Sequence, residues 1–580
     1  MVKKHSTGAL SLEEHETQDK RYAEGHEYDY LFVGMGSAAL SCAALLTKKG
    51  YKVCMLEAHD LPGGYVHTFK MADYSFCAQI HYIWGCGEGD KIYTFLQKLG
   101  LEKEVTFELM GPEGYDLMSL PDGNKVFVPY GFDRLIENIC DKYPDQRKAL
   151  NKFVGIMRNV RREMKFLPSG KIKFFDYLKL YKVWTLFKYR KATLQKVFDE
   201  CGLSKEAQLV LCGQAGDYGL PPARLSFIIY VALFGGYNTG AYYPTKHFKF
   251  YIDRLVQSIT DNEGCHTYYE TKVTKFNTEG DKMVSVETEN GKTFTAKNII
   301  CNMDPQAASH MIGREKFSQD DLKKLDYEYS ESGVMIYLAL KDIKLEDYGF
   351  GSYNIWHMED WDMNEMWERQ AGGDFSKLWF FLSTPSLHTK DRGNCPEGVE
   401  LLEVTTFTDY KPFKEKSERS YEEYNQYKID LAMKMMDVLE KKFIPNVRDH
   451  IALQVIGSPV TNEDYVMAPN GNAYGSTMTP KQMDPKNRLT AKTPFKNFWW
   501  CNASSGFAGV SGTVSTGLQL YEDLTGDYFY DSKKAPTDDE LVKRVQLQID
   551  EELEKGSKHL SKVRERGKLV KEGSSPVESL

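Results

Sequence analysis

This chain of 580 residues lacks the sequence patterns of a membrane-spanning helix, of a metal site and of a serine or cysteine nucleophile. It has no run of 18 apolar residues, so the sequence predicts no transmembrane helix. Its 11 cysteines never stand in a CxxC spacing, which argues against a zinc ribbon or a thioredoxin-type site. No grouping of ligand residues predicts a metal site, and none predicts a Ser-His-Asp or Cys-His nucleophile.

The N-terminal segment and the cysteines indicate the cellular compartment to expect. Residues 1–27 lack the apolar core of a secretory signal and carry six acidic residues, so we expect a polar tail rather than a signal or transit peptide. An odd number of cysteines in a long chain argues against a disulfide framework. Together these features predict free thiols and a cytoplasmic protein, with peripheral attachment to a membrane left open.

Composition narrows the class of protein. A net charge of −8 argues against a general nucleic-acid binder. With 42% hydrophobic and 27% charged residues the chain is expected to fold, into up to about four domains or a large enzyme with an inserted domain. The aromatic share of 13% is high and includes 36 Tyr and 31 Phe. We therefore expect an aromatic interior, tunnel or interface.

The first 30 residues after the tail form a recognisable unit. A strand at 28–33 leads into Gly34-Met35-Gly36-Ser37-Ala38-Ala39, a GxGxxA turn, and then a helix of small residues at 37–49. A second strand at 52–56 ends at Glu57. Glycines in this turn let backbone N–H groups approach a pyrophosphate at the helix N-terminus, and the acid can accept hydrogen bonds from a ribose. The unit predicts dinucleotide binding on a parallel, doubly wound sheet.

The remaining elements are predicted from periodicity. Residues 131–233 favour helices, and a long helix is expected at 420–442. Residues 455–530 are expected to alternate short strands with Gly-rich turns, and Thr537 to Glu540 form a capping box before a helix docked on the body or on a partner. Further strands are expected at 264–276, 283–289, 297–301, 334–340, 378–383 and 400–407.

A second Gly pair, Gly63-Gly64, stands before Tyr65-Val66-His67-Thr68 and gives the chain a resemblance to a known family. The segment resembles flavoproteins of the phytoene desaturase group in the amine oxidase superfamily, above all carotenoid isomerases and retinol saturases. The resemblance continues at Phe76 and His81 of an FDxGxH pattern, in residues 240–244 of a GGxYPxGG block, in residues 302–305, and in the ungapped segment 501–517. It implies FAD as the cofactor.

The resemblance also implies which residues contact the cofactor. These are Gly34, Gly36, Ser37, Ala38, Glu57, Ala58, Gly63, Gly64, Tyr65, Val273, Asn502, Gly512, Thr513 and Val514. The chain departs from the family pattern at several of the motif positions. Tyr65 replaces Arg, Cys77 and Gln79 replace Asp and Gly of FDxG, Lys246-His247 replace the Gly pair after Tyr-Pro, and Cys501, Asn502, Gly506 and Phe507 differ in the last motif.

The predicted fold class is α/β, a Rossmann-type FAD-binding domain with an inserted α+β substrate domain, both built from discontinuous segments. The FAD-binding domain is assigned residues 28–110, 240–310 and 455–530. The substrate and membrane-facing domain is assigned residues 111–239 and 311–454. Residues 531–580 form a charged C-terminal helix and tail.

Three residues are predicted to take part in the chemistry. His81 is either a proton donor or orienting group, or a hydrogen-bonded structural histidine behind the flavin loop. Lys246 and His247 either reach the flavin or a substrate carboxylate, or lie on a loop that bows into solvent. Asp304 is expected to cap a turn rather than act as a base, and Cys501 to be a small buried residue.

The segment 165–192 interleaves eight basic residues and eight aromatic residues with one acid, Asp176. This composition suits the surface of an anionic membrane, or a helix whose aromatic face is core and whose lysines reach water, with RNA binding a distant third. A second aromatic run consists of Phe227, Tyr230, Phe234, Tyr237, Tyr242 and Tyr243. We expect the two to form a path from a membrane surface to the flavin.

The function predicted is an FAD-dependent oxidoreductase or isomerase acting on carbon–carbon double bonds of a lipophilic polyene. Hydride transfer to and from the flavin would saturate, desaturate or isomerise a carotenoid, retinoid or polyunsaturated fatty acid. The alternatives are an amine-oxidase-like flavoprotein and a non-catalytic flavin- or lipid-binding protein. Homo-oligomerisation is left open.

Overall fold

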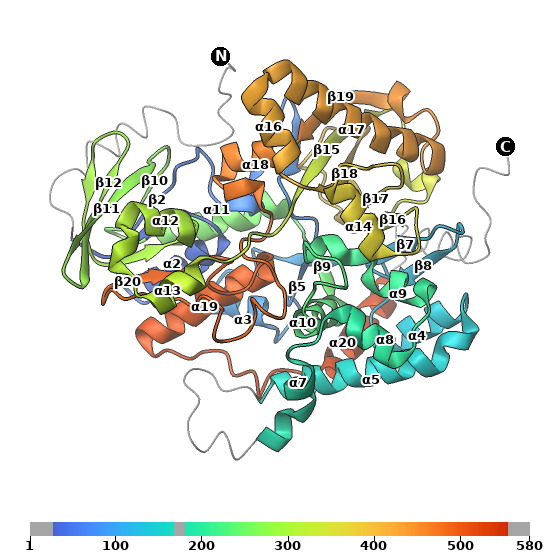
Figure 1. Ribbon diagram of the computed structural model, residues 1–580, viewed down its shortest axis with the longest axis horizontal. Coiled ribbons are helices and arrows are strands. Elements are labelled where there is room, and N and C mark those ends of the chain that lie inside the picture. The colour runs from blue at the N-terminus through green and yellow to red at the C-terminus, as the bar shows by residue number, and fades with distance from the viewer. Residues whose placement is uncertain (1–26, 167–179, 555–580) are drawn as a thin grey trace.

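The computed structural model describes residues 27–166 and 180–554, in which two large sheets form separate cores. Figure 1 shows the sheet containing β2, β10 and β20 on the left and the sheet containing β15 to β19 on the upper right. A group of helices lies below the second sheet, and loops from both halves meet in the middle. The predicted α/β fold class is confirmed by this arrangement.

The five-stranded sheet is parallel throughout and has β1 at its centre. Its strands, in spatial order, are β10 (His266–Tyr268), β2 (Val53–Leu56), β1 (Tyr28–Val33), β14 (Ala296–Cys301) and β20 (Phe498–Trp500). Apolar residues occupy both faces of β1 because both faces are covered: one side packs with residues of α2 (Ser37–Lys48), α11 (His247–Thr260) and α19 (Val510–Thr525), and the other with residues of β11 (Val273–Glu279), β12 (Lys282–Thr288) and α12 (Pro305–Ile312). The helix α2 packs against α11 and α19. Gly517 of α19 lies against the Ala38 carbonyl, where a side chain would not fit.

The seven-stranded sheet is mixed and belongs to the other half of the molecule. In order its strands are β19 (Ile451–Gly457), β15 (Ser332–Lys341), β18 (Val399–Thr408), β17 (Trp379–Ser383), β16 (Asn354–Met358), β7 (Asp116–Ser119) and β8 (Lys125–Val128). The long helix α17 (Tyr421–Lys442) packs against β15 and β19. The strands at 332–341, 379–383 and 399–408 and this helix agree with the elements expected from the sequence.

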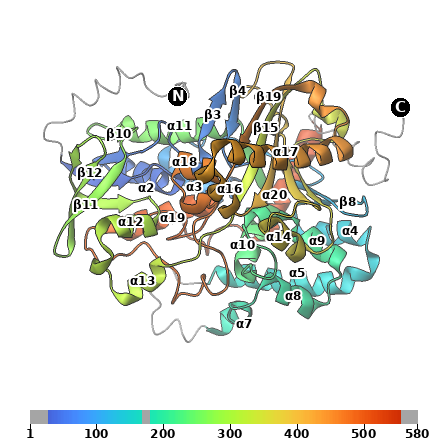
Figure 2. The same ribbon diagram turned by 45° about the horizontal axis from the view of Figure 1, so that its top comes forward.

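A helical layer covers the end of that sheet, as Figures 1 and 2 show. It contains α4 (Phe132–Cys140), α5 (Arg147–Met164), α7 (Trp184–Tyr189), α8 (Leu194–Cys201), α9 (Lys205–Cys212), α10 (Phe227–Asn238) and the C-terminal α20 (Asp538–Glu554). The predicted capping box begins α20, because Glu540 N–H donates to Thr537 Oγ1 at 3.3 Å and Thr537 N–H donates to Glu540 Oε2 at 2.7 Å. Leu541, Val545 and Ile549 are buried, so this helix docks on the body of the chain.

Smaller elements connect the two halves. Three sheets are β3 (Thr68–Met71) with β4 (Tyr74–Cys77); β5 (Ile83–Trp84), β9 (Ala241–Pro244) and β6 (Phe107–Leu109); and β11 (Val273–Glu279), β12 (Lys282–Thr288) and β13 (Thr293–Phe294). The helices are α3 (Lys91–Leu99), α12 (Pro305–Ile312), α13 (Gln319–Leu325), α14 (Met363–Ala371), α15 (Pro385–His388), α16 (Lys411–Arg419) and α18 (Pro459–Val466).

Two expectations about local structure were wrong. The single strand expected at 264–276 is two strands in different sheets, since Glu270 has a φ of +47° and the Thr271 N–H donates to the Glu57 carbonyl at 2.7 Å. Residues 455–530 contain the helices α18 and α19 and the one short strand β20 beyond the end of β19, rather than repeated strands. Most of this segment is irregular because it lines cavities instead of pairing in a sheet.

Candidate flavin and substrate site

The GxGxxA turn is held by side chains from two distant segments. Gly36 N–H donates to Asn302 Oδ1 at 2.8 Å, and Met35 N–H donates to Glu57 Oε2 at 2.8 Å. The second Glu57 oxygen accepts the His59 N–H at 3.0 Å. A Cβ on Gly36 would lie 2.6 Å from Asn302 Oδ1, so only glycine permits this contact.

The second Gly pair lies directly against the first turn. Gly63 N–H donates to the Met35 carbonyl at 2.9 Å, and Gly36 and Gly63 form an isolated parallel bridge. Gly63 and Gly64 have φ values of +112° and +58°, which side chains disfavour. The two Gly-rich turns therefore form one continuous backbone surface.

That surface lines a cavity of about 200 Å³, here called the cofactor cavity. Its chemistry fits a pyrophosphate at the N-terminus of α2. This helix has no side-chain cap and no acidic residue in its first turn. Ser37 is 5% exposed and its Oγ has no hydrogen-bond partner. This buried hydroxyl can donate to an anion beside the free N–H groups at the N-terminus of α2.

The predicted cofactor residues fall into two groups. Those that line the cofactor cavity are Gly36, Ser37, Ala38, Gly63, Gly64, Tyr65, Asn502 and Thr513. Those that do not line it are Gly34, Glu57, Ala58, Val273, Gly512 and Val514. Glu57 instead supports the turn, Val514 and Val273 are buried in the cores on either side of the sheet, and Gly512 lies where a Cβ would be 3.0 Å from Phe507.

Asn302 was not predicted to contact the cofactor, although it is the first residue of the motif at 302–305. The residue joins Gly36 to the Cys501 carbonyl through its two amide atoms. The loop 466–475 was also missed, because its only sequence signal is a Pro and a few glycines. Asp304 caps α12 as expected, accepting the Ala307 N–H at 3.0 Å and the hydroxyls of Tyr327 and Tyr329 at 2.7 Å.

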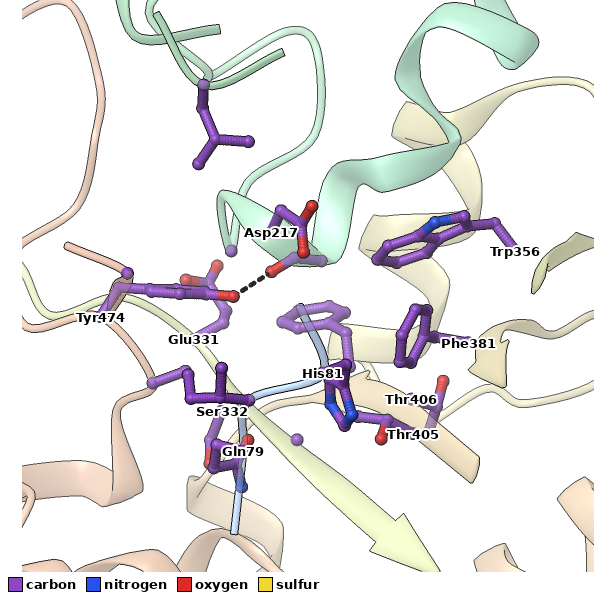
Figure 3. Close-up of a pocket in the computed structure, with 18 of the residues that line it drawn as sticks. Gln79, His81, Asp217, Glu331, Ser332, Trp356, Phe381, Thr405, Thr406 and Tyr474 are labelled. Carbon is purple, nitrogen blue, oxygen red and sulfur yellow. Dashed lines mark hydrogen bonds between the residues drawn. The ribbon is translucent and has the colours of Figure 1, made fainter. Parts of the chain in front are cut away.

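A second cavity of about 110 Å³ adjoins the first and is here called the aromatic cavity. Residues shared by the two linings are Gln79, Ile80, Ala473, Tyr474, Gly509 and Val510. Figure 3 shows Tyr474 on one side and Trp356 and Phe381 on the other, with His81 and Asp217 between them. A molecule in this cavity would therefore reach the edge of whatever fills the cofactor cavity.

Aromatic rings make up much of the wall. Phe381 lies 4.3 Å from Trp356 between ring centroids, and Phe407 stacks on Trp367 at 3.7 Å. Of the aromatic run expected to line a path, only Tyr237 lies in this wall, while the other five residues are core. The rings that do form the wall come mainly from α14, β16, β17 and β18 of the seven-stranded sheet region.

His81 lines the aromatic cavity and is held by a carboxylate that the sequence did not reveal. Its Nδ1 lies 2.8 Å from Glu403 Oε2, and the Glu403 side chain is fully buried on β18. Burial raises the pKa of Glu403, while the bond to His81 lowers it. The pair leaves Nε2 of His81 as the ring nitrogen without this contact, on a residue that lines the aromatic cavity.

A second acidic group lies at the other side of the aromatic cavity. The Tyr82 hydroxyl lies 2.6 Å from Asp217 and 3.3 Å from Asp116, whose carboxylate also accepts from the Gln214 amide. Burial raises the pKa of Asp116 to about 7, and burial together with the nearby Asp116 raises the pKa of Asp217 well above its usual range. These carboxyl groups can therefore hold protons near neutral pH.

The structure does not bring Lys246 and His247 to His81. Both line a third cavity, bounded by the β3–β4 hairpin and the start of α11, which shares no lining residue with the other two. Lys246 lies over the Phe250 ring at 4.7 Å, and His247 Nε2 lies 3.8 Å from Asp391. Tyr243 is buried, whereas Lys246 is exposed.

Two further searches concern the described residues alone. Within 27–166 and 180–554, no group of three or more His, Cys, Asp or Glu residues is placed to hold a metal ion. In the same part of the chain no helix has both the length and the apolar character needed to cross a bilayer. All 11 cysteines are buried and free.

A parallel sheet with a Gly-rich turn, an uncapped helix N-terminus and an adjoining aromatic cavity defines a dinucleotide-dependent enzyme fold. The family described as flavin containing amine oxidoreductase matches residues 40–519. The chain belongs to this family. The predictions of an FAD cofactor and of an enzyme are thereby confirmed.

Similar curated proteins carry two kinds of activity in their names. The chain is 24% identical over 525 residues to all-trans-retinol 13,14-reductase of Danio rerio, covering 85% of each. It is 23% identical over 541 residues to prolycopene isomerase 2, chloroplastic, of an Oncidium hybrid cultivar, covering 90% of this chain and 88% of that protein.

Solved structures agree on the fold. An oxidoreductase from Methanosarcina mazei matches with a TM-score of 0.54 and 16% identity, over 85% of this chain and 99% of that one. Putrescine oxidase bound to putrescine matches with a TM-score of 0.58 and 12% identity, over 86% of this chain and 99% of that one.

Proposed function

We propose that this protein reduces or isomerises carbon–carbon double bonds of a lipophilic polyene at its FAD. The observation that carries the proposal is the aromatic cavity, which opens onto the cofactor cavity and is walled by flat rings. Such rings can hold a conjugated chain by stacking and exclude water from it. Relatives named as a retinol reductase and a prolycopene isomerase support this substrate class.

A bound flavin supplies hydride transfer to or from the substrate carbon. The chain itself must supply the proton that a reduction requires at the neighbouring carbon. His81 is suited to this role because it lines the aromatic cavity and Glu403 holds its Nδ1, which leaves Nε2 for a substrate. Glu403 acts as a positioning residue for this imidazole.

The charge of the aromatic cavity bears on which polyene enters. The described residues that line it include the acids Asp217 and Glu331 but no lysine or arginine. Arg224 lies 3.0 Å from Glu331 and pairs with it. A carboxylate substrate would therefore meet these carboxyl groups with no lysine or arginine in the lining to pair with, which favours a retinoid or carotenoid over a polyunsaturated fatty acid.

The deciding experiment uses the purified protein after FAD is added. We expect a flavin absorption spectrum, and we expect the photoreduced protein to be reoxidised without oxygen by all-trans-retinol or a carotenoid, with loss of the conjugated absorption band. A polyunsaturated fatty acid should reoxidise it more slowly. No flavin spectrum, or a reduced flavin that all three substrates leave unchanged together with no isomerised product, would contradict the proposal.

A second candidate function is oxidation of an amine. A cavity walled by tryptophan, tyrosine and phenylalanine also suits an ammonium group, through cation–π contact. Release of hydrogen peroxide on addition of aliphatic or aromatic amines would favour this function. Its absence, with polyene turnover present, would remove it.

Peripheral membrane binding is part of the same proposal, since polyenes reside in bilayers. Much of the basic, aromatic segment 165–192 lies outside the described residues. At its two described ends Phe166, Trp184 and Phe187 are 46%, 66% and 45% exposed. Lys182 lies 5.4 Å from the Phe166 ring and Arg190 lies 3.7 Å from the Phe187 ring, so cations and exposed rings share one surface.

Membrane binding is tested by sedimentation with liposomes. We expect the protein to bind anionic liposomes, to release them as salt is raised, and to lose affinity when Trp184 and Phe187 are replaced by serine. Replacing Tyr421, an exposed residue at the start of α17 and outside this surface, by serine is the control. Equal binding to neutral liposomes, or none to either, would contradict peripheral attachment through this surface.

A further inference from the structure

The third cavity, with a volume of about 280 Å³, is built from three segments far apart in the sequence. Thr68, Ser75 and Cys77 come from the β3–β4 hairpin, and residues 246–250 form the first turn of α11. The segment 385–394 closes the remaining side. Because its lining is separate from the other two cavities, the proposed flavin chemistry leaves this site without a role.

Two departures from the family pattern meet in this cavity. Cys77 stands where the family has Asp, and Lys246-His247 stand where it has a Gly pair. These positions are 169 residues apart for Cys77 and Lys246, yet both line the same space. An acid has been lost and a cation gained at one site, which changes its charge toward positive.

The cavity also contains a buried polar side chain that no protein atom satisfies. Asn394 is 4% exposed, and neither its amide nitrogen nor its amide oxygen has a hydrogen-bond partner. The Thr68 hydroxyl is likewise buried and unpartnered. Groups buried in this way cost free energy unless a ligand or water meets them.

The positive groups at this site are the start of α11 and the Lys246 ammonium. The helix has 14 residues, no side-chain cap and no acidic residue in its first turn, so its free N–H groups attract an anion. Within the described part of the chain, no carboxylate pairs with Lys246, whose Nζ lies over the Phe250 ring. Burial lowers the pKa of His247, so its imidazole stays neutral at physiological pH.

Two carboxylates also face the cavity and are already engaged. Asp253 is held by Lys249 at 2.5 Å. Asp391 accepts the Gly393 N–H at 2.6 Å and lies 3.8 Å from His247 Nε2. Asp253 is therefore paired with a cation, and Lys246 with the α11 N-terminus stands opposite Asp391, the carboxylate that no lysine of this lining pairs with.

We propose that the third cavity binds an oxyanion, the phosphate or carboxylate group of a small molecule, between Lys246, the Asn394 amide and the first turn of α11. The Asn394 NH₂ group and the α11 N–H groups donate to its oxygens, and Lys246 supplies the opposite charge. This inference is independent of the proposed action on polyenes.

The test is calorimetric titration of the FAD-loaded protein with inorganic phosphate and, separately, with acetate at constant ionic strength. Loading with FAD fills the other phosphate-binding site beforehand. We expect saturable binding of one ion. Lys246→Met removes the ammonium group and Asn394→Asp adds a negative charge, so each variant should weaken the binding about tenfold or more. Tighter binding of phosphate than of acetate assigns a phosphate source, and the reverse assigns a carboxylate.

The control variant is Lys48→Met, because Lys48 is an exposed lysine on α2 outside this cavity. It should bind as the wild type does. Lys246 is exposed, so Lys246→Met is expected to fold. This variant therefore tests the proposal even if Asn394→Asp fails to fold. No saturable binding of either ion, or binding that Lys246→Met leaves unchanged, would overturn the proposal.

Discussion

The cofactor cavity and the aromatic cavity share a wall but are built in opposite ways. Backbone atoms and small residues such as Gly36, Gly63 and Ser37 form the first, and a Cβ added at Gly36 would collide with Asn302. Large side chains such as Trp356 and Phe381 form the second. A site made of backbone admits few substitutions, whereas a site made of rings can be rebuilt from many elements. The two regions should therefore respond differently to mutation.

The largest effect is expected for Gly36→Val. Its Cβ would lie 2.6 Å from Asn302 Oδ1 and its branches would enter the cofactor cavity. We expect bound flavin to fall below about a tenth of the wild-type amount, measured as flavin absorbance per protein after purification. Gly155→Ala is the control, since nothing lies within 4 Å of a Cβ there. If Gly36→Val retained the wild-type amount of bound flavin, the cofactor cavity would tolerate substitution as the aromatic cavity is expected to, and the contrast between them would be contradicted.

In the aromatic cavity, Glu403→Gln should retain flavin but lose turnover. The substitution replaces the buried, titrating carboxylate that holds Nδ1 of His81 by a neutral amide, so we expect kcat to fall about 10²- to 10⁴-fold and the pH profile of kcat to change. Thr405→Val, two residues along the same strand, removes an unpartnered buried hydroxyl of the cavity and should leave kcat within about twofold. If both variants lose turnover equally, the effect belongs to packing and not to the His81–Glu403 pair.

A smaller effect is expected for a single ring of the wall. Phe381→Leu removes ring contacts to His81 at 4.6 Å and Trp356 at 4.3 Å, so KM for a polyene should rise about three- to tenfold with kcat little changed. Phe380→Leu is the matched control, because the neighbouring Phe380 is fully buried on the other face of β17. An equal rise in KM for both variants would show that the wall does not contact substrate.

A last effect concerns stability and pH rather than turnover. Burial raises the pKa of Asp116 from 3.8 to about 7, so folding favours its protonated form. The stability it contributes is complete below its unfolded pKa and is lost as pH rises from about 4 to 7, at up to about 1.4 kcal/mol per pH unit. Asp116→Asn should lack this loss. Urea unfolding of both proteins across that range measures the difference, and parallel curves would contradict it.

The contrast also explains what the sequence could predict. The βαβ unit was predicted correctly in type and nearly in its bounds, because tight turns and close backbone approach require glycine at fixed spacing. The partners that complete the site, Asn302 and Glu403, are 266 and 322 residues from Gly36 and His81. No local pattern encodes such pairs, since an Asn after a strand and a Glu within a strand are ordinary.

The expectation for the aromatic residues failed for a related reason. The run from Phe227 to Tyr243 is locally rich in rings, yet α10 is apolar on all sides and most of its rings are core. The cavity wall takes Trp356, Trp367 and Trp379 from three separate elements. Only the fold shows which of many aromatic residues face an open space.

The bond between Gly36 and Asn302 has a consequence for how the enzyme is made. Asn302 is synthesised long after the first Gly-rich turn, and the same amide bonds the carbonyl of Cys501, which follows only near the end of the chain. A growing chain on the ribosome therefore cannot close its cofactor cavity until α19 has emerged. FAD must enter after synthesis is nearly complete, and a supply of the vitamin from which it is made would govern how much of the finished chain matures.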